Sequence, residues 1–96
     1  MQKTVCEYLK EKLAAGAKLL DVRTYEEYIN GALPGAEHIP LNILPVVANE
    51  RLDRDEEVLV YCRVGNRALM AEKILASLGF NKVTAIGGIE QLQHCR

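Results

Sequence analysis

A cysteine followed by a short arginine-containing loop is the part of this sequence best suited to chemistry. Residues 58–67 read Val-Leu-Val-Tyr-Cys-Arg-Val-Gly-Asn-Arg. This order predicts a buried strand that ends at Cys62, then a loop, then the start of a helix. Backbone N–H groups at a helix start, together with Arg63 and Arg67, favour a thiolate and attract anions. We therefore expect Cys62 to be a nucleophile.

The loop that follows Cys62 has the composition of an anion cradle. The amides of Val64, Gly65 and Asn66 can curve around a negatively charged sulfur, and glycine permits the positive φ that such a curve often requires. Guanidinium groups suit oxyanions, so we expect Arg63 and Arg67 to bind an anionic substrate. A thiolate that is already ionised needs no general base, and the lack of a nearby histidine is therefore no objection.

A second set of charged residues follows the strand predicted over residues 18–22. We expect Asp21 to support the cysteine loop by accepting backbone hydrogen bonds, and Arg23 to pair with Glu26 or Glu27. In open parallel sheets, ligands bind beyond the carboxyl ends of the strands. Both Asp21 and Cys62 lie at such ends, which places the predicted site at that edge of the sheet.

Size and composition restrict the class of protein. The chain has 96 residues, 49% of them apolar and 26% charged, which predicts a single domain over residues 1–96. A net charge of −1 gives no reason to expect nucleic acid or an acidic membrane as partner. No apolar run approaches the ~20 residues of a membrane span, and the charged N-terminus lacks a signal-peptide core. A cytoplasmic location is the resulting expectation.

The three cysteines, Cys6, Cys62 and Cys95, are an odd number, and in a reducing compartment they predict no disulfide framework. No two cysteines have metal-ligand spacing, so we expect no metal and no other cofactor. Cys6 is expected to fill space beside a helix. Cys95 is expected to be an exposed bystander at a fraying terminus, although it could also receive a sulfur or resolve Cys62 as a disulfide.

Apolar spacing and turn residues predict strands alternating with helices. The expected helices cover residues 4–15, 25–29, 41–49 (interrupted at Pro45) and 68–78, and the expected strands cover residues 18–22, 36–39, 58–61 and 82–86. Thr24 and Glu27 have capping-box spacing, residues 51–57 are a charged loop, and Gly87-Gly88 turns the chain into a short final helix. This alternation predicts a small parallel sheet with helices on both faces.

Five short motifs, in order, resemble those of single-domain rhodaneses, the thiosulfate sulfurtransferase-like proteins. They are Leu20-Asp21-Val22-Arg23, Glu27-Tyr28-Ile29-Asn30-Gly31, the stretch from Leu33 to Pro40, the cysteine loop at 61–67 and Gly87-Gly88. The chain departs from the family pattern at Ala32, where histidine is usual, and at Leu92, where an aromatic residue is usual. The segment before Lys18 is also short for the family's first edge strand.

The resemblance implies a three-layer α/β/α fold with a small, mostly parallel sheet, and a sulfurtransferase activity. Cys62 would take sulfane sulfur from thiosulfate or a related anionic donor as a persulfide. It would then pass the sulfur to a thiophilic acceptor: cyanide in the test tube, a thiol or a sulfur-acceptor protein in a cell. An edge strand left unpaired could also support dimerisation.

Two alternatives remain open. A rhodanese-fold phosphatase or arsenate reductase would use five residues between the cysteine and the arginine, whereas four residues separate Cys62 from Arg67. The shorter loop favours a lone sulfur over a tetrahedral oxyanion. A sulfur carrier or docking domain would form a persulfide, or bind a partner, without turnover.

Overall fold

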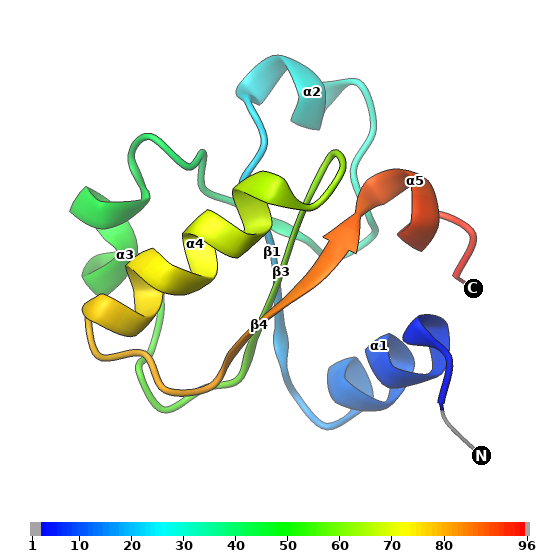
Figure 1. Cartoon of the computed structure of the whole chain (residues 1–96), viewed down its shortest axis with the longest axis horizontal. Coiled ribbons are helices and arrows are strands. Elements are labelled where there is room, and N and C mark those ends of the chain that lie inside the picture. The colour runs from blue at the N-terminus through cyan, green and yellow to red at the C-terminus, as the bar shows by residue number, and fades with distance from the viewer. Residues whose placement is uncertain (1–2, 96) are drawn as a thin grey trace.

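Four parallel strands form the centre of the protein, seen here in a computed structural model that describes residues 3–95 (Figure 1). Their order across the sheet is β2-β1-β3-β4. The strands are β1 (Lys18–Asp21), β2 (Glu37–His38), β3 (Val58–Cys62) and β4 (Val83–Gly88). Within residues 3–95 no strand precedes β1, so the family's additional edge strand is absent from the described part of the chain.

Helices cover both faces of this sheet, which confirms the α/β class expected from the sequence. They are α1 (Val5–Ala14), α2 (Tyr25–Ile29), α3 (Leu44–Arg51), α4 (Asn66–Ser77) and α5 (Ile89–Leu92). Helices α3 and α4 lie on one side of the strands, and α1 and α5 lie on the other (Figure 1). The result is three layers.

The core is divided in two by the alternation of side chains along β3. Val58, Val60 and Cys62 belong to a cluster with α3 and α4, while Leu59 and Tyr61 belong to a cluster with α1 and α5. All five side chains are completely buried. Successive residues of a strand point to opposite faces, so an unbroken apolar run is what a central strand covered on both faces requires.

Local signals explain where the helices begin and end. Thr4 and Thr24 each form a full capping box, with Glu7 and Glu27 respectively, at the start of α1 and α2. Asn30 is the C-cap of α2, as the sequence predicts, and Gly31 follows with φ of 136°. Pro45 does not interrupt α3, because it lies in the first turn, where proline removes no helical hydrogen bond.

Two expectations about the C-terminal part need correction. Gly87 and Gly88 are not a turn but the last residues of β4, paired with Tyr61 and Cys62 of β3 after a register shift. Helix α4 begins at Asn66, two residues before the predicted start. The glycine pair therefore lies in the sheet beside the cysteine loop, and α5 follows β4 directly.

The cysteine assignment was also wrong, because Cys6 and Cys95 form a disulfide. The two residues are 89 positions apart in sequence, yet α1 and α5 pack on the same face of the sheet and bring them together. The spacing of Cys6 and Cys95 along the chain does not predict that they lie close together. Cys95 is half-buried rather than fully exposed, and Cys62 is the free cysteine of the described residues. No helix within residues 3–95 has the length and apolar character needed to cross a membrane.

Candidate functional site at the Cys62 loop

Cys62 ends β3 at the carboxyl edge of the sheet, and its sulfur faces the start of α4. The N–H groups of Gly65 and Ala68 donate to Sγ, with donor-to-sulfur distances of 2.9 and 3.4 Å. Donors at the N-terminal end of a helix stabilise negative charge on a thiolate. The side chain is completely buried, so the loop shields the sulfur from bulk water.

The loop reaches Sγ because of its glycine. Gly65 has φ of 115°, a conformation that L-residues with a side chain rarely adopt. This conformation leads the chain from the loop into α4, and the amide of Gly65 donates to the sulfur. The amides of Val64 and Asn66 do not donate to Sγ, whereas that of Ala68, which the sequence analysis missed, does. Val64 is instead 70% exposed and forms the outer tip of the loop.

Gly87 and Gly88 support the loop from the neighbouring strand. A Cβ atom added at Gly88 would lie 2.3 Å from the carbonyl oxygen of Arg63 and 2.9 Å from Cα of Val64. Real Cβ atoms do not approach backbone this closely, so only glycine allows the loop to rest on β4. The Gly-Gly pair in the sequence marks the position of this contact, although the sequence analysis interpreted the pair as a turn.

The two arginines of the loop have different surroundings. Arg67 donates from both terminal nitrogens to Glu27, at 2.7 and 3.0 Å. This pairing lowers the pKa of the Glu27 carboxyl to about 2 and raises that of Arg67. Arg63 is exposed and forms no side-chain hydrogen bond or ion pair with another described residue. Glu27 thus caps α2 and also holds the end of the loop.

Asp21 and Arg23 form a buried network instead of the contacts expected for them. Asp21 accepts from the backbone N–H and the guanidinium of Arg23, and the hydroxyl of Tyr61 donates to it at 2.6 Å. Arg23 also donates to the carbonyl of Gly31 at 2.7 Å. Within residues 3–95, Arg23 makes no hydrogen bond or ion pair with Glu26 or Glu27. No backbone group of the cysteine loop donates a hydrogen bond to Asp21.

Tyr61 is the buried residue that joins this network to the next segment. Its hydroxyl accepts from the N–H of Leu33 at 3.0 Å while donating to Asp21. Burial and the hydrogen bond to Asp21 raise the pKa of this phenol above its usual value. The network therefore fixes residues 31–33 to the ends of β1 and β3. A tyrosine in an apolar run gives no sequence signal of such a partner.

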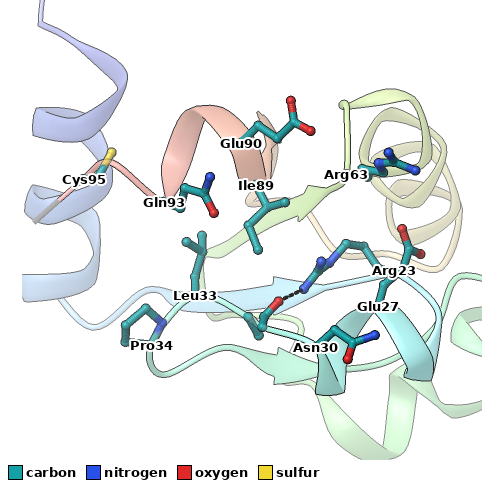
Figure 2. A pocket seen from close by; sticks show the side chains of 12 residues that line it. Arg23, Glu27, Asn30, Leu33, Pro34, Arg63, Ile89, Glu90, Gln93 and Cys95 are labelled. Atoms are coloured by element: carbon teal, nitrogen blue, oxygen red, sulfur yellow. Dashed lines mark hydrogen bonds between the residues drawn. The ribbon is translucent and has the colours of Figure 1, made fainter.

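A cleft adjoins the loop on the face that carries α1 and α5. It is lined by Arg23, Glu27, Asn30, Gly31, Ala32, Leu33, Pro34, Arg63, Ile89, Glu90, Gln93 and Cys95 (Figure 2). Arg63 lies at one end and Cys95 at the other (Figure 2). Across residues 3–95 no group of three or more histidine, cysteine or acidic side chains is arranged to hold a metal ion.

The protein has a parallel sheet and a cysteine loop that joins a central strand to a helix. Comparison with known protein families identifies the family to which this arrangement belongs. The model of the rhodanese-like domain matches residues 5–95 of the chain. This protein therefore belongs to the rhodanese-like family. The sequence resemblance and the three-layer fold are both confirmed by this match and by the solved structures.

Among individual relatives, the putative sulfurtransferase YtwF of Bacillus subtilis is 40% identical over 83 residues, which cover 84% of this chain and 80% of YtwF. The putative sulfur carrier protein YrkF of the same organism is 39% identical over 79 residues; these cover 80% of this chain but 42% of YrkF. The structure of the human single-domain sulfurtransferase TSTD1 superposes with a TM-score of 0.81 at 28% identity, covering 94% of this chain and 93% of TSTD1. Two of these relatives are named as sulfurtransferases and the third as a sulfur carrier, so all three names concern the handling of sulfur.

Proposed function

We propose that this protein is a sulfurtransferase in which Cys62 is the catalytic nucleophile and carries sulfur as a persulfide. The observation that carries this proposal is the position of Sγ between the N–H groups of Gly65 and Ala68 at the start of α4. Those donors stabilise both the attacking thiolate and the persulfide anion that replaces it. Relatives named as sulfurtransferases support the same activity.

Thiosulfate, or a donor of the same chemistry, supplies the sulfur in this proposal. The Cys62 thiolate attacks the outer sulfur of thiosulfate and forms a new S–S bond. The bond between that sulfur and the sulfonate breaks, and sulfite leaves with its electron pair. An acceptor nucleophile then attacks the outer sulfur of the persulfide, and the electron pair of the broken S–S bond returns to Cys62.

The residues of the loop have different roles in binding the sulfur donor. Arg63, exposed and without another described partner, contacts the anionic group directly. Arg67 adds positive charge from the end of the loop while Glu27 holds it in place. Val64, Gly65 and Asn66 set the path of the cradle. Asp21 and Arg23 support it indirectly, through Tyr61 and residues 31–33.

Intact mass measurement after thiosulfate treatment tests this assignment. Under non-reducing conditions Cys6 and Cys95 are bonded to each other, so an added sulfur is assigned to Cys62. We expect one added sulfur atom, lost on addition of cyanide and absent from Cys62→Ser. A folded protein with reduced Cys62 that gains no sulfur would contradict thiosulfate as donor.

Two other functions give different results in the same samples. A carrier or docking domain would gain the sulfur but show negligible steady-state turnover with thiosulfate and cyanide. A phosphatase would hydrolyse an aryl phosphate without forming a persulfide. The four-residue spacing from Cys62 to Arg67 favours transfer of a single sulfur over both phosphate and arsenate chemistry.

A cytoplasmic location and a single domain over residues 1–96 remain predictions. The alkylation state of Cys6 and Cys95 in freshly quenched cells tests the first of them. Cytosolic thiols are normally kept reduced, so the Cys6–Cys95 disulfide argues against a cytoplasmic location. Alkylation of both cysteines in cells would agree with that location, and an intact bond there would contradict it.

A further inference from the structure

The Cys6–Cys95 disulfide is accessible at the surface of the protein. Cys95 lines the end of the cleft that is opposite Arg63 (Figure 2). Both cysteines are partly exposed, so a thiol from solution can reach the bond. Exposed disulfides are typically more easily reduced than buried structural ones, and they include the regulatory ones. The bond therefore gives the protein two covalent states, one oxidised and one reduced.

The segment that ends at Cys95 is short and is held by few interactions. Helix α5 has four residues and begins directly after Gly88, the last residue of β4. Leu92 is its buried side chain. Two backbone hydrogen bonds continue the segment to the disulfide, from Gln93 to Ile89 at 2.8 Å and from Cys95 to Leu92 at 2.9 Å. The covalent link to α1 is therefore a large part of what fixes the position of α5.

Helix α5 also contacts the glycine pair that supports the cysteine loop. The side chain of Gln91 lies against Gly87, where an added Cβ atom would be 2.9 Å from Oε1 of Gln91. Gly87 in turn lies beside Gly65, since a Cβ atom added at Gly65 would be 3.7 Å from Cα of Gly87. The carbonyl of Arg63 rests against Gly88. A continuous series of contacts thus connects the disulfide, through α5 and the end of β4, to the loop.

We propose that the Cys6–Cys95 disulfide is a redox switch that controls sulfur transfer at Cys62. In the oxidised state α5 is held to α1, and the glycine pair keeps the loop in the position in which Gly65 and Ala68 donate to Sγ. In the reduced state α5 and α1 are no longer joined, and the loop loses part of its support. Transfer is therefore faster in the oxidised protein. This inference rests on the proposed sulfurtransferase function and adds its regulation.

A dithiol reductant changes the state of the switch. One of its thiolates attacks a sulfur of the Cys6–Cys95 bond and forms a mixed disulfide, and the other cysteine leaves as a thiolate with the electron pair of the broken bond. The second thiolate of the reductant then attacks the reductant's own sulfur in the mixed disulfide and releases the first cysteine. The cysteine pair gains two electrons and two protons from the reductant, which becomes a disulfide. Cys62 takes no part in either step.

Amide hydrogen exchange, followed by NMR, tests the coupling without any sulfur chemistry. The N–H groups of Gly65 and Ala68 are compared in oxidised protein, in protein reduced with dithiothreitol, and in the double variant Cys6→Ser/Cys95→Ser. Coupling between two sites of a protein usually changes an equilibrium by a factor of about five or more. We therefore expect both amides to exchange at least about fivefold faster in the reduced protein and in the double variant.

Leu13→Ala is the matched control for a general loss of stability. It removes apolar packing from α1 but leaves the disulfide in place, so Gly65 and Ala68 should exchange as in the oxidised wild type. Equal exchange in the oxidised and reduced proteins would overturn the proposal. Faster exchange in oxidised Leu13→Ala would overturn it as well, because the loop would then respond to the stability of α1 rather than to the bond.

Turnover with thiosulfate and cyanide tests the consequence for sulfur transfer. The reductant is removed before the assay, and intact mass after alkylation verifies the state of the bond in each sample. We expect kcat/KM to be about fivefold lower in the reduced protein and in Cys6→Ser/Cys95→Ser than in the oxidised protein. Reoxidation should restore the wild type, whereas the double variant should respond to neither treatment.

The outcomes separate the switch from the proposed function on which it rests. Equal kcat/KM in the oxidised and reduced proteins would overturn the switch while leaving sulfur transfer intact. If Cys62 forms no persulfide in either state, the sulfurtransferase function fails, and the exchange of Gly65 and Ala68 still decides whether the loop depends on the disulfide.

Discussion

The sulfur of Cys62 is held by backbone groups, so its surroundings depend on the path of the loop more than on any one side chain. Gly65 supplies the positive φ that leads the chain into α4, where the N–H of Ala68 donates to Sγ. Gly88 leaves room for the carbonyl of Arg63 where no Cβ atom would fit. At the scale of single residues, the absence of a side chain at Gly65 and Gly88 is therefore as important to the site as the two arginines of the loop.

Gly88→Ala should therefore reduce sulfur transfer strongly. The new Cβ atom would displace Arg63 and Val64, and a displacement of about 1 Å can lower a rate about a hundredfold. Turnover with thiosulfate and cyanide measures the effect. Gly16→Ala is the control: it has φ of 100° and open space around it, so it should lower stability by about 1 kcal/mol and leave turnover unchanged. Equal activity of Gly88→Ala would contradict the contact.

Tyr61→Phe should destabilise the fold by about 2–3 kcal/mol. It removes the hydroxyl that bonds Asp21 and the N–H of Leu33, and it leaves buried polar groups with fewer partners. Urea unfolding measures the change. Tyr25→Phe, at a tyrosine that is 65% exposed, is the matched control and should be neutral. A neutral Tyr61→Phe would mean that water replaces the hydroxyl.

At the scale of elements, α2 and α4 are joined at the carboxyl edge of the sheet by one ion pair. Glu27 is the N3 residue of the α2 capping box and also the partner of Arg67 in the first turn of α4. The start of the helix that faces Sγ is therefore attached to a second helix. The sequence predicts the cap from the spacing of Thr24 and Glu27, but not the arginine that shares the same carboxylate.

Glu27→Gln should cost about 1–2 kcal/mol near neutral pH, because solvent screens a pair whose side chains are 31% and 26% exposed. The folded-state pKa of Glu27 lies below the ordinary value of 4.5, at about 2, chiefly because Arg67 donates to the carboxylate. Its contribution is thus complete above pH 4.5 and is lost as the pH falls toward 2. Urea midpoints across this range should converge for Glu27→Gln and wild type. Glu26→Gln, an exposed neighbour, should follow wild type at every pH; a gap that persists at pH 2 would contradict the ion pair.

For the whole molecule, the Cys6–Cys95 disulfide connects the first helix to the segment after the last. Leu9 is the one buried side chain of α1, so the helix depends on limited packing and on this covalent link. In the chain-entropy account, a bond that closes a long loop stabilises chiefly by restricting the unfolded chain.

Reduction of the disulfide should lower the free energy of unfolding by about 2–4 kcal/mol. Denaturant unfolding with and without dithiothreitol measures this, and Cys6→Ser should reproduce the reduced state. Cys62→Ser serves as control and should respond to the reductant as wild type does. Before reduction, the denatured protein should react as one thiol, and afterwards as three; three reactive thiols at the start would contradict the bond.

Apolar patterning, caps and turn residues determine much of this protein locally. They predict the alternation of helices and strands, the buried strand before Cys62, the capping box at Thr24 and the positive φ at Gly65. These features are encoded within a few residues of one another, where periodicity and backbone preference act. The family resemblance and the nucleophile at Cys62 follow from the same local motifs.

Tertiary structure alone decided which distant residues meet. The partners of Arg67, Tyr61 and Cys6, and the cleft between Arg63 and Cys95, depend on how the strands are ordered and on which face each helix covers. Contacts between residues 28 to 89 positions apart leave no periodic signal in a single sequence, because they are set by the packing of whole elements. The chemistry of the loop is therefore local, whereas the contacts that support the loop belong to the fold.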